Sequence, residues 1–386
     1  MSLRELRSAQ VRGKRVVVRV DFNSEVDGRG RVRDLTRMRA VLPTITWLLK
    51  KNAAVILVAH RGRPNGVTTS LSLRPFVSAL EQIVRRRVTF LTAPLGSAQL
   101  LAATRKLKPG SVALLENIRF DRGEEKNSLR TAKQLVALGD VFVLDAFADA
   151  HRAHASIVGI RKFRPVYAGL LLAAEVHHLE RLMKAPKHPF VAVIGGAKIS
   201  TKLGVVRRLL KVADHVLLGG ALANTMLQAE GVAIGASLSE PAMLKAARGI
   251  RASTAKLEIP TDVVVRNKRG VVRTTAVANV KSDEKIVDVG PDTIDLFSRA
   301  LRIAKTIVWN GPLGTYEIPP FNKGTIAIAR VIGKRRVVAV AGGGETLDAI
   351  TRAKATGGFT FLSTGGGAML EFLEGKSLPG IRAVQK

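Results

Sequence analysis

Short runs of Val, Ile and Leu recur along this chain, and each run ends in glycine or in polar residues. They predict β-strands at 14–23, 53–60, 111–117, 141–147, 189–197, 215–221, 306–312, 335–344 and 359–367. Continuous apolar strands are typical of parallel sheets covered on both faces. Helical patterns lie between them, for example at 35–51 and 200–213. This alternation predicts an α/β fold with doubly wound parallel sheets.

The length of the chain predicts two domains. Its 386 residues exceed what a single hydrophobic core normally holds. A helical segment at 173–186, followed by Lys-His-Pro, lies between the two groups of strands. We therefore expect this segment to connect the two halves.

Composition excludes several classes of protein. The chain has no cysteine, which excludes a disulfide framework, a thiolate nucleophile and a cysteine metal site. It has no apolar run of about eighteen residues, so we expect no membrane span. The start of the chain, MSLRELRSAQ, lacks the apolar core of a signal peptide. The expected location is the cytoplasm.

The charge is strongly positive. Sixty-two Lys and Arg residues against 30 Asp and Glu give a net charge of +32. The basic residues are scattered along the chain, and only two Trp and two Tyr are available to stack on bases. This pattern favours a surface that binds polyanions without sequence preference over a dedicated nucleic-acid binder, although the second alternative stays open.

Cationic side chains follow the predicted strands of the first half. Parallel strands of an open sheet end at the edge where ligands bind, so we expect these side chains to meet there. The polar and cationic residues at these ends are Asp21, Asn23, His60, Arg63, Arg119, His151, Arg152 and His154, with Arg37 on the following helix. Each Arg alone could be a solvated charge, and the two last histidines could be structural. Together the arginines indicate a site for a small, multiply anionic ligand.

Glycine follows the predicted strands of the second half, in GGAK, GGALAN, NGPLG, AGGGE and STGGG. The segment VWNGPLGTYE, 308–317, shows the pattern most clearly: a buried strand ends in a turn and then a glutamate. A single such end can be only a tight turn. Their repetition before helices is typical of a nucleotide site, because backbone amides can then approach phosphate. No Walker motif, no G-x-G-x-x-G after the first strand and no Ser nucleophile elbow is present.

The same blocks resemble the phosphoglycerate kinase family over essentially the whole chain. They include RVDFN, HRGRP, LLENIRF, DAFADAHRAHAS, GGAKISTKLG, VWNGPLGTYE, GGGET and STGGGAMLEFLEGK. The resemblance implies two Rossmann-like domains and a hinge closure, in a monomer that transfers a phosphoryl group reversibly between ATP and 3-phosphoglycerate in glycolysis. It implies a phosphoglycerate-binding domain at 1–170, a connecting helix at 171–187 and a nucleotide-binding domain at 188–371. The tail, about 372–386, is expected to pack on the N-terminal domain.

Residue by residue, the resemblance implies two sets of binding residues. The substrate-binding set is Asp21, Phe22, Asn23, Arg37, His60, Arg61, Gly62, Arg63, Arg119 and Arg152. The nucleotide-binding set is Gly196, Lys198, Lys202, Gly219, Gly220, Gly290, Asn310, Pro312, Glu317, Gly342, Gly343, Gly344, Glu345 and Thr346. Within these sets, Arg37, Lys198, Gly343 and Gly344 are the expected catalytic residues. Glu345 is the expected ligand of Mg²⁺, the implied cofactor.

This sequence departs from the family pattern at several positions. They are Ser24, Glu25, Arg61, Leu144, Ala148, Asp149, Ala221 and Glu345. Asp149 places a carboxylate near the substrate arginines, and Arg61 adds a cation. Glu345 stands where the family has Asp, which concerns the metal because Glu carries its charge on one more methylene. It could also contact no metal and only cap its helix.

The expected roles agree with elementary chemistry. A carboxylate acceptor is already ionised at neutral pH, so no general base is needed. Catalysis then consists of positioning the reactants and neutralising charge on the transferred group. Two rivals are a non-catalytic nucleic-acid-binding protein of the same fold and a kinase for another acyl-phosphate substrate.

Overall fold

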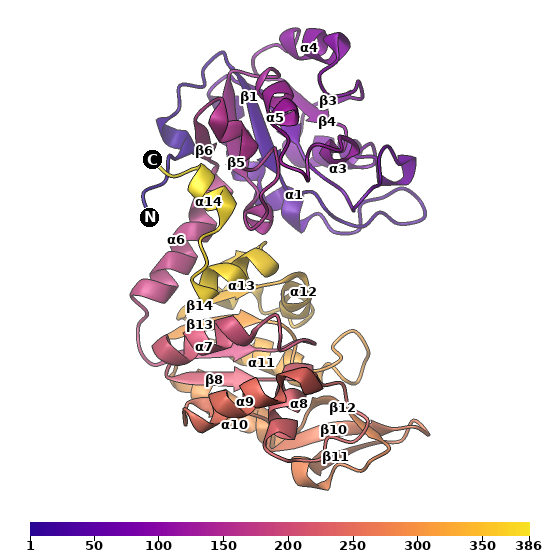
Figure 1. Ribbon diagram of the computed structural model, residues 1–386, viewed down its shortest axis with the longest axis vertical. Coiled ribbons are helices and arrows are strands. Elements are labelled where there is room, and N and C mark those ends of the chain that lie inside the picture. Colours follow the sequence, from indigo (N-terminus) through magenta and orange to yellow (C-terminus); the bar gives the residue numbers. More distant parts are fainter. The chain divides into compact units, whose positions relative to one another are not determined.

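The computed structural model describes all 386 residues, and the chain divides into two compact units (Figure 1). Unit 1 comprises Met1–His177 with Ser377–Lys386, and unit 2 comprises His178–Lys376. Helix α6, Leu170–Lys184, contains the boundary between them. No helix combines the length and the apolar character needed to cross a membrane.

The end of the chain belongs to unit 1. The amide of Gly380, in the first turn of α14, Pro379–Ala383, donates to the carbonyl of Ala150 at 2.8 Å. The tail was predicted to begin at about 372. In the structure, helix α13, Gly367–Glu374, belongs to unit 2, and the segment that belongs to unit 1 begins at Ser377.

Unit 1 is built on one parallel sheet with the strand order β3-β4-β2-β1-β5-β6. The strands are β1 Arg15–Val20, β2 Ala54–Val58, β3 Val88–Leu91, β4 Val112–Leu115, β5 Val141–Asp145 and β6 Val166–Ala168. The helices are α1 Thr36–Ala40, α2 Leu42–Lys50, α3 Phe76–Val84, α4 Ala98–Arg105 and α5 Leu129–Val136. Every residue of β2 and β4 is buried, as the continuous apolar runs require when helices cover both faces.

Unit 2 contains a second parallel sheet, ordered β15-β14-β13-β7-β8-β9. Its strands are β7 Phe190–Ile194, β8 His215–Leu218, β9 Leu257–Glu258, β13 Thr306–Asn310, β14 Val338–Gly342 and β15 Phe361–Ser363. The remaining helices are α7 Leu203–Val212, α8 Gly220–Ala229, α9 Leu244–Ala252, α10 Pro291–Ile303, α11 Lys323–Gly333 and α12 Gly344–Arg352. Helix α7 buries Val205, Val206 and Leu209, the spacing of one helical face.

A small antiparallel sheet in unit 2 was not predicted. It consists of β10 Asp262–Asn267, β11 Val272–Ala276 and β12 Glu284–Val289, with β10 in the middle. Only one face is buried: Val263 and Val265 point into a small core, while Arg266 is exposed. Half-buried strands alternate polar and apolar residues, so a search for continuous apolar runs does not find them.

The predicted α/β class with two doubly wound parallel sheets is confirmed. Each predicted strand is present but shorter than expected, and the edge strands β3, β6 and β9 were missed. The single helix predicted at 35–51 is wrong: α1 ends at Ala40 and α2 begins at Leu42. Pro43 explains the break, because proline cannot donate the backbone hydrogen bond of a helix interior and is tolerated only in the first turn.

Trp309 provides a test of the core of unit 2. Its side chain is fully buried on β13, and Nε1 donates to the carbonyl of Gly311 at 2.9 Å. Trp309→Ala is expected to lower the free energy of unfolding of unit 2 by about 3–5 kcal/mol, because it leaves a large cavity. Denaturant unfolding followed by far-UV circular dichroism measures this loss. Trp47, partly buried on α2 of unit 1, is the control; an equal loss from Trp47→Ala would contradict the prediction.

Candidate active site

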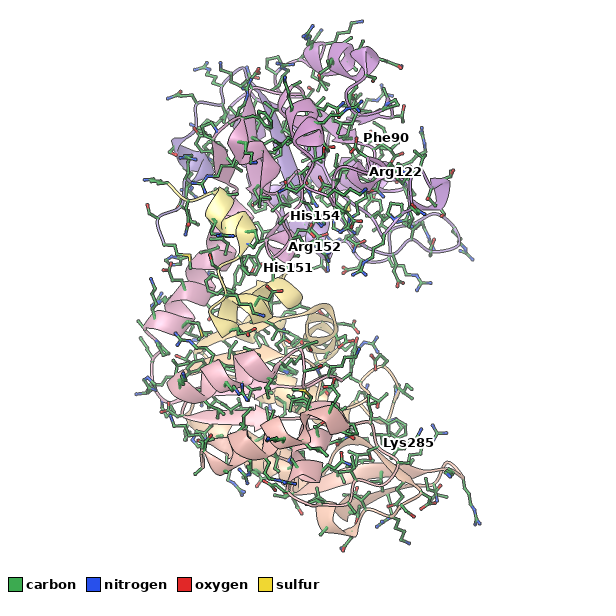
Figure 2. The ribbon with its side chains drawn as sticks, in the orientation of Figure 1. Phe90, Arg122, His151, Arg152, His154 and Lys285 are labelled. Carbon is green, nitrogen blue, oxygen red and sulfur yellow. The ribbon has the colours of Figure 1, made fainter.

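The carboxyl edge of the sheet in unit 1 gathers the predicted cations. Strands β4, β2, β1 and β5 are neighbours and parallel, so the residues that follow them come together at one edge. Asp21 follows β1, His60 and Arg63 follow β2, Arg119 follows β4 and Arg152 follows β5. Figure 2 shows Arg152 beside His151 and His154 in the segment after β5.

The turns after β1 and β2 are joined by polar contacts. Asp21 forms an ion pair with Arg37 on α1, and its Oδ1 accepts from the amide of Asn23 at 2.9 Å. The amide oxygen of Asn23 in turn accepts from the amide of Gly62 at 2.9 Å. Phe22 is fully buried and lies parallel to Phe76, with ring centroids 6.4 Å apart. Asp21 and Asn23 thus position Arg37 and the loop that carries Arg63.

Arg119 is buried, and its guanidinium group has a hydrogen-bond donor that is not used within the chain. Its Nη1 donates to the carbonyl of Gly62 at 2.5 Å and its Nε lies 3.1 Å from Glu125, but Nη2 has no hydrogen-bond partner. Burial lowers the pKa of Arg119, against the opposing charge of Glu125. A buried guanidinium with an unused donor is the group that a bound anion would satisfy.

The two arginines of the HRGRP segment differ. Arg61 donates to the carbonyl of Ser72 at 3.0 Å and stacks 5.8 Å above Phe76, so it holds the loop against α3. Arg63 is exposed and makes no ion pair within the chain. Arg63 is therefore the better placed of the two to reach a ligand.

A carboxylate lies among these cations, at the predicted position. Asp149 Oδ2 is 3.0 Å from Arg19 Nη2 and 3.3 Å from His60 Nδ1, and Oδ1 is 3.3 Å from Arg152 Nε. Arg19, which our sequence analysis missed, is fully buried near the end of β1. A charged residue directly after the apolar run Val16–Val18 and before Val20 was the signal that could have revealed it.

Oxygen and nitrogen atoms of Asp21, His60 and Asp149 lie within 4.8 Å of one another, close enough to hold a metal ion. The surroundings do not fit a cation, because Asp21 pairs with Arg37 and Asp149 with Arg19 and Arg152. The cluster is a counterion network.

In unit 2, a hydrogen-bond network joins the ends of three neighbouring strands. Lys202 is buried, and its Nζ donates to the carbonyl of Gly195 after β7 and to Oδ1 of Asn310 on β13 at 3.0 Å. Asn310 Nδ2 donates to the carbonyl of Gly342 on β14 at 2.8 Å. Burial lowers the pKa of Lys202 to about 8, although the charge of Glu345 raises it. A bound phosphate would favour the charged ammonium.

A pocket of about 230 Å³ opens beside this network. The predicted residues in its lining are Gly196, Gly220, Pro312, Glu317 and Glu345. Only glycine fits at Gly220: its φ is +65°, and a Cβ there would lie 2.9 Å from the backbone of Gly196. The close approach of two glycine turns leaves room for a ligand against the backbone.

Asp288 was missed by our sequence analysis and also lines the pocket. Burial raises the pKa of its carboxyl to about 7, against the amides of Gly324 and Val289 that donate to it at 2.8 and 2.9 Å. Ala221, one of the departures from the family pattern, lies in the lining as well.

The triple glycine opens helix α12. Gly343, with φ +98°, precedes the helix, and Thr346 Oγ1 accepts from the amide of Gly311 at 2.7 Å. The first amides of a helix lack partners within it and carry a partial positive charge, so they suit phosphate. Glu345 is exposed in this first turn and makes no ion pair within the chain.

Other predicted nucleotide residues lie outside the lining. Lys198 is exposed in the turn after β7, Gly219 precedes α8, and Gly290 precedes α10 beside Asp262. Gly290 follows the pocket-lining Asp288 by two residues but is not itself in the lining, and its role stays a prediction.

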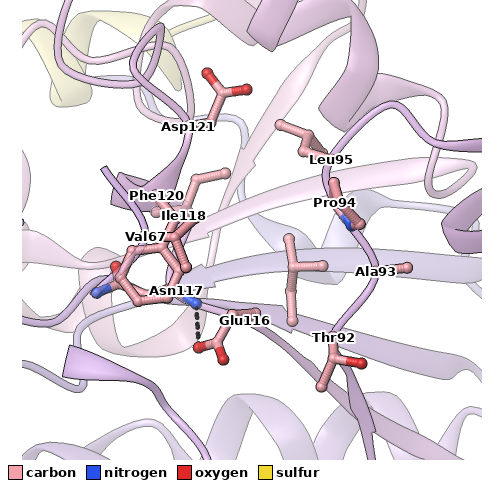
Figure 3. Close-up of a pocket in the computed structure, with 11 residues that line it drawn as sticks. Val67, Thr92, Ala93, Pro94, Leu95, Glu116, Asn117, Ile118, Phe120 and Asp121 are labelled. Atoms are coloured by element: carbon pink, nitrogen blue, oxygen red, sulfur yellow. Dashed lines mark hydrogen bonds between the residues drawn. The ribbon is translucent and has the colours of Figure 1, made fainter. Parts of the chain in front are cut away.

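A second cavity, of about 320 Å³, lies beyond β3 and β4 in unit 1 (Figure 3). It is lined mainly by apolar side chains such as Leu95, Ile118 and Phe120, and it contains none of the predicted site residues. Glu116 in its wall already accepts from Ser72 Oγ at 2.7 Å and from the amide of Leu73 at 2.8 Å. No cationic side chain lines this cavity, so it is not a candidate site for a phosphate.

Comparisons with known proteins agree with this arrangement. The family model described as phosphoglycerate kinase matches residues 6–376. The phosphoglycerate kinase of Desulforudis audaxviator (strain MP104C) is 46% identical over 392 residues, covering 100% of both chains. That of Maricaulis maris (strain MCS10) is 44% identical, covering 99% of this chain and 97% of the other.

The solved structure of phosphoglycerate kinase from Coxiella burnetii is 36% identical with a TM-score of 0.86, covering 99% and 98% of the two chains. That from Pyrococcus horikoshii OT3 is 30% identical with a TM-score of 0.88, covering 98% of each chain. The chain therefore belongs to the phosphoglycerate kinase family.

Proposed function

We propose that this phosphotransferase, which moves a phosphoryl group reversibly between ATP and 3-phosphoglycerate, binds 3-phosphoglycerate at the carboxyl edge of unit 1 and the nucleotide at that of unit 2. The observation that carries the substrate assignment is the buried Arg119, whose Nη2 lacks a partner at the edge where Arg37, Arg63 and Arg152 also gather. A ligand with a phosphate and a carboxylate matches several guanidinium groups at once.

The nucleotide assignment is supported by the amides at the start of α12 and by Lys202. Gly343 and Gly344 offer backbone donors to phosphate, and Lys202 offers a buried ammonium group. Glu317, in the pocket lining, is suited to accept from ribose hydroxyls. The adenosine would occupy the apolar part of the pocket, against Leu313 and Leu238.

The chemistry follows from these groups. A carboxylate oxygen of 3-phosphoglycerate attacks the γ-phosphorus of ATP, and the bond to the leaving oxygen of ADP breaks. The groups that we expect to offset negative charge on the transferred group are Arg37 in unit 1, and Lys198 with the amides of Gly343 and Gly344 in unit 2. No residue has to remove a proton, because the attacking carboxylate is ionised.

Magnesium is the metal that this site fits. Mg²⁺ in kinases keeps several waters and takes one or two carboxylates together with phosphate oxygens. Glu345 is an exposed carboxylate in the lining of the nucleotide pocket, in the first turn of α12, and has no ion partner. It would hold the ion, whose charge would offset that of the phosphates.

We further propose a monomeric enzyme of the cytoplasm, with the basic surface binding polyanions only through charge. The rival acyl-phosphate kinase and the non-catalytic nucleic-acid binder are separated from this proposal by one coupled assay with ATP and 3-phosphoglycerate.

Substitution of the cations tests their roles. Arg37→Ala and Lys198→Ala are each expected to lower kcat by about 10²-fold or more, because each removes positive charge from the transition state. Arg119→Ala is expected to act mainly on the KM for 3-phosphoglycerate. Steady-state kinetics measure both effects. Arg39 on the same helix as Arg37 and Lys211 on α7 are exposed controls, and Arg39→Ala and Lys211→Ala should leave kcat unchanged. Normal turnover in Lys198→Ala would exclude its catalytic role.

Metal preference tests Glu345. Glu must fold back, or reach the ion through a water, where the shorter Asp would bind directly. Mn²⁺ is larger than Mg²⁺ and less strict in geometry. We expect the ratio of activity with Mn²⁺ to activity with Mg²⁺ to be at least as high in the wild type as in Glu345→Asp. Kinetics with both metals in wild type, Glu345→Asp and Glu345→Gln give the answer. If Glu345→Gln leaves the metal dependence unchanged, Glu345 only caps its helix.

Salt dependence tests the polyanion proposal. With a net charge of +32, the protein is expected to be retained on heparin at low salt and released as salt rises, because binding liberates counterions. Fluorescence titrations with DNA and RNA of unrelated sequence should give similar affinities. Binding that resists salt, or that prefers one sequence, would instead favour the dedicated nucleic-acid binder.

A further inference from the structure

Asp149 is an anion built into a site for anions. It ends the short helical turn Phe147–Asp149 after β5, and its side chain is 4% exposed. Three nitrogen-bearing side chains face it: the guanidinium groups of Arg19 from β1 and of Arg152 three residues further along the chain, and the imidazole of His60 from the end of β2.

The contacts of Asp149 with its neighbours are ion pairs more than well-aligned hydrogen bonds. Asp149 Oδ2 and Arg152 Nε have no hydrogen bond of acceptable geometry, although both take part in ion pairs of 3.0–3.3 Å. Arg19 does not depend on Asp149 alone, because its Nε donates to Ser156 Oγ at 2.8 Å and its Nη1 donates to the carbonyl of Val20. Asp149 therefore contributes mainly its charge.

That charge is permanent under physiological conditions. Burial by itself would raise the pKa of the Asp149 carboxyl, but the contacts with His60 and Arg19 outweigh burial and hold the pKa well below its usual range. Asp149 lies on a buried turn, and its side chain is in contact with Arg19 and Arg152.

We propose that Asp149 is an internal competitor of the substrate, an affinity-tuning residue that weakens the binding of 3-phosphoglycerate to the cations of unit 1. This inference rests on the proposed substrate site. The carboxylate of Asp149 lies against Nε of Arg152 and Nδ1 of His60, so a bound substrate anion shares these side chains with Asp149 and is repelled by its charge.

The net charge of the protein explains why weaker binding of the substrate would be useful. A surface with +32 charges raises the positive potential at an anion site and slows the release of a highly charged ligand. An internal carboxylate lowers the local potential without removing the arginines that orient the substrate. A residue that only fixed the arginines would behave in the opposite way, because its loss would weaken binding.

The test is calorimetric titration of the full-length protein with 3-phosphoglycerate, without nucleotide. Asp149→Asn keeps the shape and an acceptor for Arg19 but removes the charge. We expect its Kd for 3-phosphoglycerate to fall about 3- to 10-fold, the scale of a unit charge several ångströms away in partly screened surroundings. Steady-state kinetics should show a matching fall in the KM for 3-phosphoglycerate and no change in the KM for ATP.

Asp140→Asn is the matched control. Asp140 pairs with Arg15 at 2.8 Å beside the opposite end of β5, so this substitution changes the net charge equally but away from the site. Its Kd should equal that of the wild type. Asp149→Thr, which places a smaller neutral residue on the same turn, provides a second variant if Asp149→Asn does not fold.

The outcomes separate this inference from the proposed site. A Kd that is unchanged or higher in the folded Asp149 variants overturns the inference, as does an equal fall in Asp140→Asn. Arg119→Ala, titrated in parallel, should lose most of the affinity. If Arg119→Ala binds 3-phosphoglycerate like the wild type, the substrate site itself is wrongly placed.

Discussion

The structure of unit 1 depends on one buried charge, the guanidinium of Arg19. Arg19 lies near the end of β1, with apolar neighbours on the strand and no exposure to solvent. A buried guanidinium is tolerated only when its donors are satisfied and an anion balances it. The carbonyl of the neighbouring Val20 meets part of that demand, and Ser156 and Asp149, from a later segment of the chain, meet the rest. Glu124 extends the network, since both its oxygens accept from Ser156, at 2.5 and 2.9 Å. The same contacts that make Arg19 tolerable thus fix the segment that carries Arg152 and His154.

The two units handle anions by different means on the same kind of sheet. Covered parallel strands leave only the carboxyl edge for chemistry. In unit 1 that edge carries guanidinium groups, which match a small ligand with anionic groups at both ends. In unit 2 it carries glycine turns and the start of α12, with Lys202 as the one buried ammonium. Backbone amides provide donors without the bulk of side chains, which leaves room for a ligand the size of a nucleotide. His154 adds little charge, because burial and the neighbouring Arg119 lower its pKa to about 4.

Sequence patterns predicted the parallel sheets and most of the cationic site, because both depend on local order along the chain. Apolar runs mark strands, and the residues that follow them mark the edge. The patterns did not predict features that depend on contacts between distant parts of the chain. Asp288 looks like any strand-end carboxylate, and only its burial beside Gly324 distinguishes it. The β10–β12 sheet was missed because one face is polar. Arg61 was expected to bind substrate, yet its guanidinium donates to Ser72; whether it also reaches a ligand stays a prediction.

Asp149 shows how the local chemistry of an anion site and the net charge of the whole protein can make opposite demands. An anion site should exclude carboxylates, and a protein with +32 charges should hold anions too tightly to release them quickly. A buried carboxylate among the arginines meets both demands, because it stabilises the cations in the empty site and lowers the positive potential that a bound anion meets. Its cost in affinity is offset by the remaining cations, of which Arg63 and the unused donor of Arg119 are free for the ligand alone. The site is therefore tuned by the balance of charges around Arg152 and His60, and the number of arginines by itself does not determine how strongly it binds.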